Sequence, residues 1–152
     1  MATTLYINTA ATDLFSAAVV SSTDGTPVSN LRPIVLGDSE LFEIFFMDGT
    51  AAESWSGDAT YGCSIGLGPL KALGDEKLVG IDAMTPDGAA KFSGQLDLAA
   101  PALVDYAYRQ AEQNCIGAIP LSLQVRVTTP AGYTETHALI SISVMKRVFP
   151  ET

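Results

Sequence analysis

The sequence is short of charge, of basic residues in particular, and of cysteine and histidine. Of its 152 residues only 16% are charged and 47% are hydrophobic, which excludes a disordered chain. Eight Lys and Arg against 17 Asp and Glu leave a net charge of −9. Phosphate backbones and anionic membrane surfaces repel such a chain, so we expect neither nucleic acid nor a membrane among its partners.

The chain also lacks a basic start and a long apolar run. Its first basic residue is Arg32, and apolar stretches such as Ile44–Met47 are too short to span a bilayer. We therefore expect no secretion signal and a product released into the cytoplasm. Cys63 and Cys115 have neither a CxxC spacing nor an adjacent histidine. We expect two buried thiols, with one disulfide as the alternative.

Apolar and polar residues alternate with a period of two through most of the sequence, which predicts strands. The pattern is clearest in residues 59–67, 91–98, 121–127 and 138–144. Further strands are expected at Thr4–Asn8, Phe15–Val20, Pro33–Leu36, Leu41–Met47 and Leu78–Met84. The apolar phase predicts a core that contains Phe42, Ile44, Phe46, Tyr61, Cys63, Ile65, Phe92, Leu96, Leu121, Leu123, Val125, Ile140 and Ile142.

Turns and one helix interrupt the strands. Thr129-Pro-Ala-Gly132 and Thr85-Pro-Asp-Gly88 have the composition of tight turns, so residues 121–148 are expected to form a hairpin. After Pro101, the residues Leu103, Ala107 and Ala111 recur every four positions, which predicts a short helix near 101–113. Such a helix would close one open end of a sandwich or cover one edge.

These elements predict a mainly β fold: a single antiparallel β-sandwich, immunoglobulin-like or jelly-roll-like, with one short inserted helix. Residues 31–152 are expected to form the sandwich domain. Residues 1–30 are rich in Ala, Thr and Ser. They are expected to form either an N-terminal strand pair or an arm that becomes ordered against a neighbouring subunit.

No motif in the sequence announces a catalytic site. His137, the sole histidine, is expected at the surface or an interface of the last hairpin rather than as a base. Gly66-Leu-Gly-Pro-Leu-Lys71 lacks the Gly-Lys-Ser/Thr ending of a phosphate loop and predicts a loop after a strand. Single Asp-Gly pairs are explained by turn preference rather than by calcium. We expect no enzyme, no cofactor and no metal.

Two features exceed the needs of an ordinary sandwich. The segment 41–47 is apolar on both phases, with Leu41, Phe45 and Met47 opposite the core residues and only Glu43 polar. Either the helix or another protein should cover that second face. Trp55, between small polar residues, is expected either to anchor an interface or to fold back onto the core. Leu41, Phe45, Met47 and Trp55 are therefore the candidate interface residues.

The order of elements resembles a known group of proteins. Pro33-Ile-Val-Leu-Gly-Asp38 leads into the apolar strand, Cys63-Ser-Ile-Gly-Leu67 follows, and Ala90–Leu98 precedes the helix and the Pro-Gly hairpin. Across residues 31–149 this pattern is similar to small β-sandwich proteins among bacteriophage tail and fibre genes, such as the N-terminal domain of baseplate upper proteins. The resemblance implies a structural role and carries over no functional residue.

The sequence therefore favours a non-enzymatic virion structural protein of a tail, baseplate or fibre-attachment region. Its expected partners are other virion proteins and copies of itself, with assembly in the host cytoplasm. Without a long C-terminal stalk, a connector or adaptor is favoured over direct receptor binding. The alternative is a carbohydrate-binding sandwich that contributes to host-surface recognition, with Trp55 and Tyr61 or Tyr133 as the stacking platform.

Overall fold

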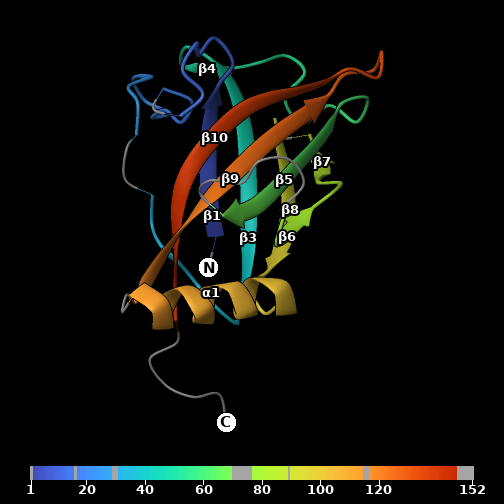
Figure 1. The fold of residues 1–152 in the computed structure, drawn as a ribbon. Coiled ribbons are helices and arrows are strands. Elements are labelled where there is room, and N and C mark those ends of the chain that lie inside the picture. The colour runs from blue at the N-terminus through green and yellow to red at the C-terminus, as the bar shows by residue number, and fades with distance from the viewer. Residues whose placement is uncertain are drawn as a thin grey trace.

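Two five-stranded sheets pack face to face in the computed structural model, which describes residues 2–15, 17–28, 31–69, 77–88, 90–114 and 117–146 (Figure 1). The first sheet has the order β1-β3-β8-β7, with β4 paired to β3, and the second has the order β2-β10-β9-β5-β6. The first contains β1 (Ala2–Asn8), β3 (Ser39–Asp48), β4 (Ala51–Ala52), β7 (Thr85–Asp87) and β8 (Lys91–Asp97). The second contains β2 (Ile34–Val35), β5 (Gly62–Pro69), β6 (Val79–Ile81), β9 (Ala118–Thr128) and β10 (Thr134–Met145).

The expected β-sandwich with one short helix is confirmed, but the sheets are mixed rather than wholly antiparallel. β1 runs parallel to β3, with Leu5 opposite Ile44 and Tyr6 opposite Phe45. β2 runs parallel to the end of β10. Both parallel strands precede β3 in the chain, so the N-terminal region supplies one edge strand to each sheet. Nothing in local alternation distinguishes parallel from antiparallel pairing.

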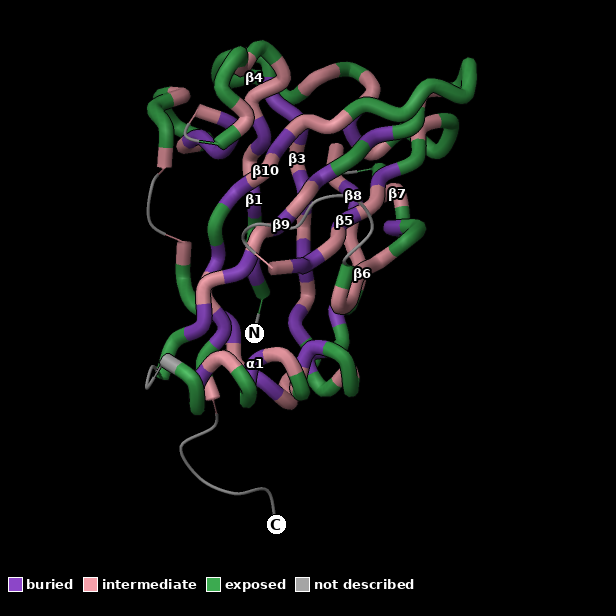
Figure 2. Tube along the Cα trace, in the orientation of Figure 1, coloured by how far each residue is buried: buried purple, intermediate pink, exposed green. Residues whose placement is uncertain are grey.

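Side chains on the inner faces of the two sheets fill one continuous core. Buried and less buried positions alternate along the strands, as Figure 2 shows. The structure buries every residue named above as core except Tyr61, which is half-buried and packs against the others. The N-terminal residues Leu5, Ile7, Ala18 and Val19 belong to the same cluster.

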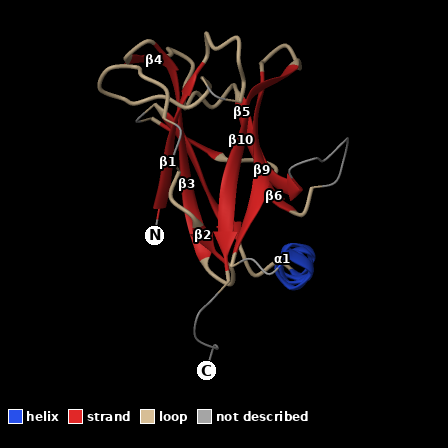
Figure 3. Ribbon diagram, turned by 60° about the vertical axis from the view of Figure 1, so that its left-hand side comes forward, coloured by secondary structure: helices blue, strands red, loops and turns tan. Residues whose placement is uncertain are grey.

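The helix α1 (Pro101–Asn114) lies across one end of the sandwich (Figures 1 and 3). Pro101 fills the first helical position, where a missing backbone N–H costs nothing, and Leu103, Ala107 and Ala111 are buried in the core. Tyr108 stays exposed, with the Lys146 ammonium 4.9 Å from its ring centre. The helix therefore closes an open end, which leaves the outer face of β3 uncovered by it.

Three predicted strands differ from the observed ones, and in two of them a polar side chain turns the backbone. The described residues of the segment Phe15–Val20 form no strand: the Asp13 carboxylate accepts the Phe15 N–H at 2.9 Å, and Phe15 is 71% exposed. Only isolated bridges form, Ile7 to Val19 and Val20 to Pro27. Asp58 likewise turns the chain at Thr60, so β5 begins at Gly62 and Ala59 is exposed. The third, Leu78–Met84, shrinks to Val79–Ile81 before a bend at 82–83.

Two predicted turn or loop segments are also strand. Thr85–Asp87 forms β7 and pairs with β8, so the chain reverses after Asp87, where Ala90 rather than Gly88 has a positive φ of 66°. Gly66–Pro69, predicted as a loop, completes β5; Leu70 and Lys71 lie outside the described residues. The hairpin at 129–132 is confirmed: Gly132 has a φ of 91° and its N–H donates to the Thr129 carbonyl at 2.9 Å.

Candidate functional site

The outer face of β1 and β3 carries half-buried apolar side chains. Leu41 and Phe45 lie on it, on the phase opposite the core. Tyr6, from the parallel neighbour β1, stacks on Phe45 with ring centres 4.9 Å apart and an interplanar angle of 19°. We refer to Tyr6, Leu41 and Phe45 as the outer aromatic face. Tyr6 was missed from the sequence because it shares a phase with the polar Thr4 and Asn8.

An ion pair interrupts this face. Lys91 on β8 donates to the Glu43 carboxylate, and the Thr4 hydroxyl donates to the same group at 3.4 Å. The hydrogen bond to Glu43 raises the pKa of the Lys91 amine above its usual range. The face is therefore apolar with one internally neutralised pair, a composition similar to the centre of a protein interface.

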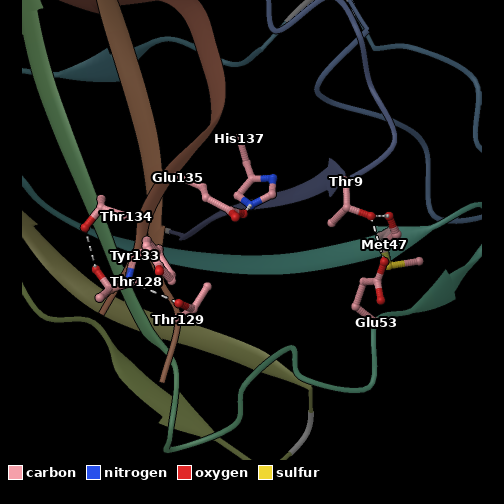
Figure 4. Close-up of polar contacts among 9 residues, drawn as sticks. All are labelled: Thr9, Met47, Glu53, Thr128, Thr129, Tyr133, Thr134, Glu135 and His137. Carbon is pink, nitrogen blue, oxygen red and sulfur yellow. Dashed lines mark hydrogen bonds and ion pairs between the residues drawn. The ribbon is translucent and has the colours of Figure 1, made fainter. Parts of the chain in front are cut away.

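Met47, the third apolar residue of this phase, is buried by its own chain. Only 5% of it is exposed, so it contributes little to a free surface. The Thr9 N–H and hydroxyl both donate to the Met47 carbonyl at 3.0 Å, and the hydroxyl also lies 2.8 Å from a Glu53 carboxylate oxygen (Figure 4). These bonds fix the end of β3 to the chain after β1 and to the loop after β4.

Trp55 lies half-buried against the core, in the segment that follows β4. β4 and α1 lie at opposite ends of the sandwich (Figure 1). The Trp55 ring is 4.9 Å from that of Phe46 and stacks on Tyr61 at 5.0 Å and 18°. Ser56 ties the loop down, since its hydroxyl accepts the Phe46 N–H at 3.0 Å and donates to the Ala90 carbonyl at 2.6 Å. The Trp55–Tyr61 pair thus packs against the core, while Tyr133 is 71% exposed at the tip of the β9–β10 hairpin.

His137 is not the surface residue expected from alternation. The register of β10 shifts between Thr136 and Ala138, and the extra residue turns its ring edge-on to Phe46 at 5.6 Å. Its side chain is 15% exposed. The Nε2 atom lies 3.4 Å from a Glu135 carboxylate oxygen but makes no hydrogen bond within the described residues (Figure 4). The bulge explains the error, because an inserted residue resets the alternation.

A second ion pair joins the buried Glu40 carboxylate to the more exposed Arg32 guanidinium. Glu40 is only 2% exposed although it is charged, because it lies on the core-facing phase at the start of β3. The Thr3 hydroxyl donates to its carboxylate at 2.7 Å and the Arg32 guanidinium at 2.5 Å. These contacts join β1, β3 and the chain before β2, which gives this carboxylate a structural explanation.

Cys63 is buried, as expected, and burial raises the pKa of its thiol to about 12. Cys115, the other thiol expected to be buried, lies outside the described residues. At pH 8 only about one Cys63 thiol in ten thousand is then ionised.

In a Cys115→Ser background we expect Cys63 to resist a disulfide reagent at pH 8 until denaturant is added. Because the pKa of this thiol exceeds the 9.0 of an unperturbed cysteine, the thiol's contribution to stability is lost as the pH rises from about 9 to about 12. Rapid labelling of the native protein would contradict this burial.

Within the described ranges, no group of three or more His, Cys, Asp or Glu side chains is placed to hold a metal ion. No helix in these ranges is long and apolar enough to cross a membrane.

No family model and no curated protein matches the chain. Among solved structures, the N-terminal domain of phage TP901-1 ORF48 is similar over 96% of this chain and 98% of that domain, with 10% sequence identity and a TM-score of 0.41. This is a weak similarity to a domain of a phage protein, and it transfers no residue role to this chain.

Proposed function

We propose that this chain is a non-enzymatic structural subunit of a phage virion, in a tail, baseplate or fibre-attachment region. It works by assembling with other virion proteins and with copies of itself. The outer aromatic face is the observation that carries this proposal. Tyr6, Leu41 and Phe45 lie on strand faces that α1 does not cover, and burying them against a partner would remove apolar area from water.

The edge strand beside this face supports the same proposal. The Tyr6 carbonyl and the Asn8 N–H point away from β3 and pair with Val20 and Ala18. By alternation, the backbone of Thr4 faces the same edge, and it has no such partner among the described residues. Residues 1–12 contain no charge and no proline, the usual devices that protect a sheet edge from pairing. Contact with another subunit would give the backbone of Thr4 hydrogen-bond partners and would bury the side chains of the outer aromatic face.

The change Phe45→Asp tests the outer aromatic face. We expect it to disrupt self-association, measured by light scattering after gel filtration, and to reduce incorporation into particles, measured by mass spectrometry of density-purified phage. A charge buried without a partner destabilises an interface by several kcal/mol. Tyr133→Asp is the matched control: it makes the same change of charge at a hairpin tip and should assemble normally.

Thermal unfolding followed by circular dichroism separates lost assembly from lost folding, and Tyr6→Thr provides a milder variant that keeps a strand-forming residue. Normal assembly of both folded face variants would contradict the proposed interface. Absence of the wild-type chain from purified particles, despite abundance in the lysate, would overturn the virion role itself.

A further inference from the structure

A polar groove of about 480 Å³ lies on the opposite side of the sandwich, on the outer face of the second sheet. Its volume is within the range of small-molecule sites. The described residues that line it include Ser64, Gly66, Gln124, Arg126, Lys77 and Asp82. The cross-strand register places Ser64 beside Arg126 and Gly66 beside Gln124. None of these residues belongs to the outer aromatic face.

One lining residue, Gly66, faces a second glycine across the sheet. Gly66 on β5 pairs with Gly80 on β6, and the aliphatic stem of Lys77 lies over both. A Cβ added at Gly66 would lie 2.9 Å from Lys77 Cδ, and one at Gly80 would lie 3.0 Å from the same atom. The missing side chains therefore let Lys77 lie close to the sheet. Its ammonium donates to the Asp82 carboxylate at 2.7 Å, which lowers the pKa of Asp82.

Arg126 gives the groove its surplus positive charge. Lys77 and Asp82 neutralise one another, so the three ionised groups leave one net positive charge on a chain whose net charge is −9. Arg126 is exposed, and within the described residues its guanidinium makes no hydrogen bond or ion pair. Its neighbours across the sheet are Ser64 and Thr136, both uncharged. A guanidinium in this setting is available for a planar carboxylate.

We propose that this groove binds a sugar acid: a hexuronate-type saccharide unit whose carboxylate pairs with Arg126. The other lining groups are hydroxyl, amide and carboxylate, which exchange hydrogen bonds with sugar hydroxyls. The single net positive charge of the groove matches a monoanion better than a doubly charged phosphate. The inference is independent of the proposed virion role, because it concerns the other sheet.

Titration of the full-length, isotope-labelled chain with galacturonate, followed by two-dimensional NMR, tests the proposal. We expect shifts of the Ser64, Gly66 and Gln124 amide signals, and none with galactose, which has the same ring without the carboxylate. Arg126→Gln should weaken binding about ten- to hundredfold, because the hydrogen bonds to a charged group are lost. Arg109→Gln is the matched control: Arg109 is exposed on α1, and its removal should leave binding unchanged.

The close approach of Lys77 to Gly66 allows a second, independent variant. Gly66→Ala should displace Lys77 and weaken galacturonate binding severalfold without loss of folding, because the clashing atom belongs to a flexible side chain. Gly88→Ala is its control, since nothing lies within 4 Å of an added Cβ there.

Three results would overturn the proposal. One is no shift of these amides with galacturonate at millimolar concentrations. Another is equal galacturonate binding by wild type and Arg126→Gln. The third is inorganic phosphate that binds at the same amides as tightly as galacturonate, which would make the groove a general oxyanion site rather than a saccharide site.

Discussion

Replacing Gly57 by alanine is expected to lower the free energy of unfolding by about 3 kcal/mol, whereas the same change at Gly49 should cost about 1 kcal/mol. Both glycines have positive φ, 77° and 65°, so the backbone penalty of alanine is shared. Only Gly57 is crowded. A Cβ there would lie 2.4 Å from the Asp87 carbonyl oxygen and 2.6 Å from the Lys91 nitrogen, while nothing lies within 4 Å at Gly49.

Urea unfolding measured by tryptophan fluorescence provides the comparison, because Trp55 is the chain's single tryptophan and lies two residues before Gly57. The extra loss at Gly57 reports how tightly the Trp55 loop packs on the β7–β8 hairpin. Backbone atoms at 2.4 and 2.6 Å cannot move aside as a side chain can. Equal losses at the two positions would contradict this close approach.

The parts of the fold that follow from local alternation could be predicted from the sequence. In β9, Ser122 and Gln124 alternate with buried Leu121 and Leu123, since one face meets the core and the other meets solvent. The helix at 101–114 and the hairpin at 129–132 follow from proline, glycine and spacing alone. Each of these signals lies within about a dozen residues of chain.

Features that depend on distant segments could not be predicted. Tyr6 meets Phe45 only because β1 runs parallel to β3, and 39 residues separate the paired positions Thr4 and Glu43. Of the aromatic pair that dominates the outer face, only Phe45 could therefore be identified from the sequence. His137 was misplaced for a related reason: its bulge against β9 exists only in the pairing of two strands.

The groove was invisible from the sequence for the same reason. Gly66 and Gly80 are ordinary strand glycines until they face one another, and Lys77 lies over both only because of that pairing. Arg126 lies on the polar phase of the alternating segment 121–127 and is exposed in the structure, but its uncharged neighbours come from two other strands. The sequence predicts which of these side chains are polar. Their arrangement around a groove depends on the register in which the strands of the second sheet pair.

Replacing Phe46 by alanine is expected to lower the free energy of unfolding by about 3–5 kcal/mol, because a fully buried ring is lost and the cavity refills only in part. The Phe46 ring lies edge-on to the Phe92 ring at 6.0 Å and 4.9 Å from the Trp55 ring. Phe15→Ala is the matched control. It removes the same atoms from a ring that is 71% exposed, and it should change stability by less than about 0.5 kcal/mol.

Fluorescence distinguishes a local from a global effect of Phe46→Ala. If Trp55 packs on the core through Phe46, the folded variant should show a red-shifted emission, since water reaches the indole, in addition to its lower unfolding midpoint. An unchanged emission with reduced stability would mean that Tyr61 and His137 hold Trp55 without Phe46. A loss no greater than that of Phe15→Ala would contradict the placement of Phe46 at the centre of the core.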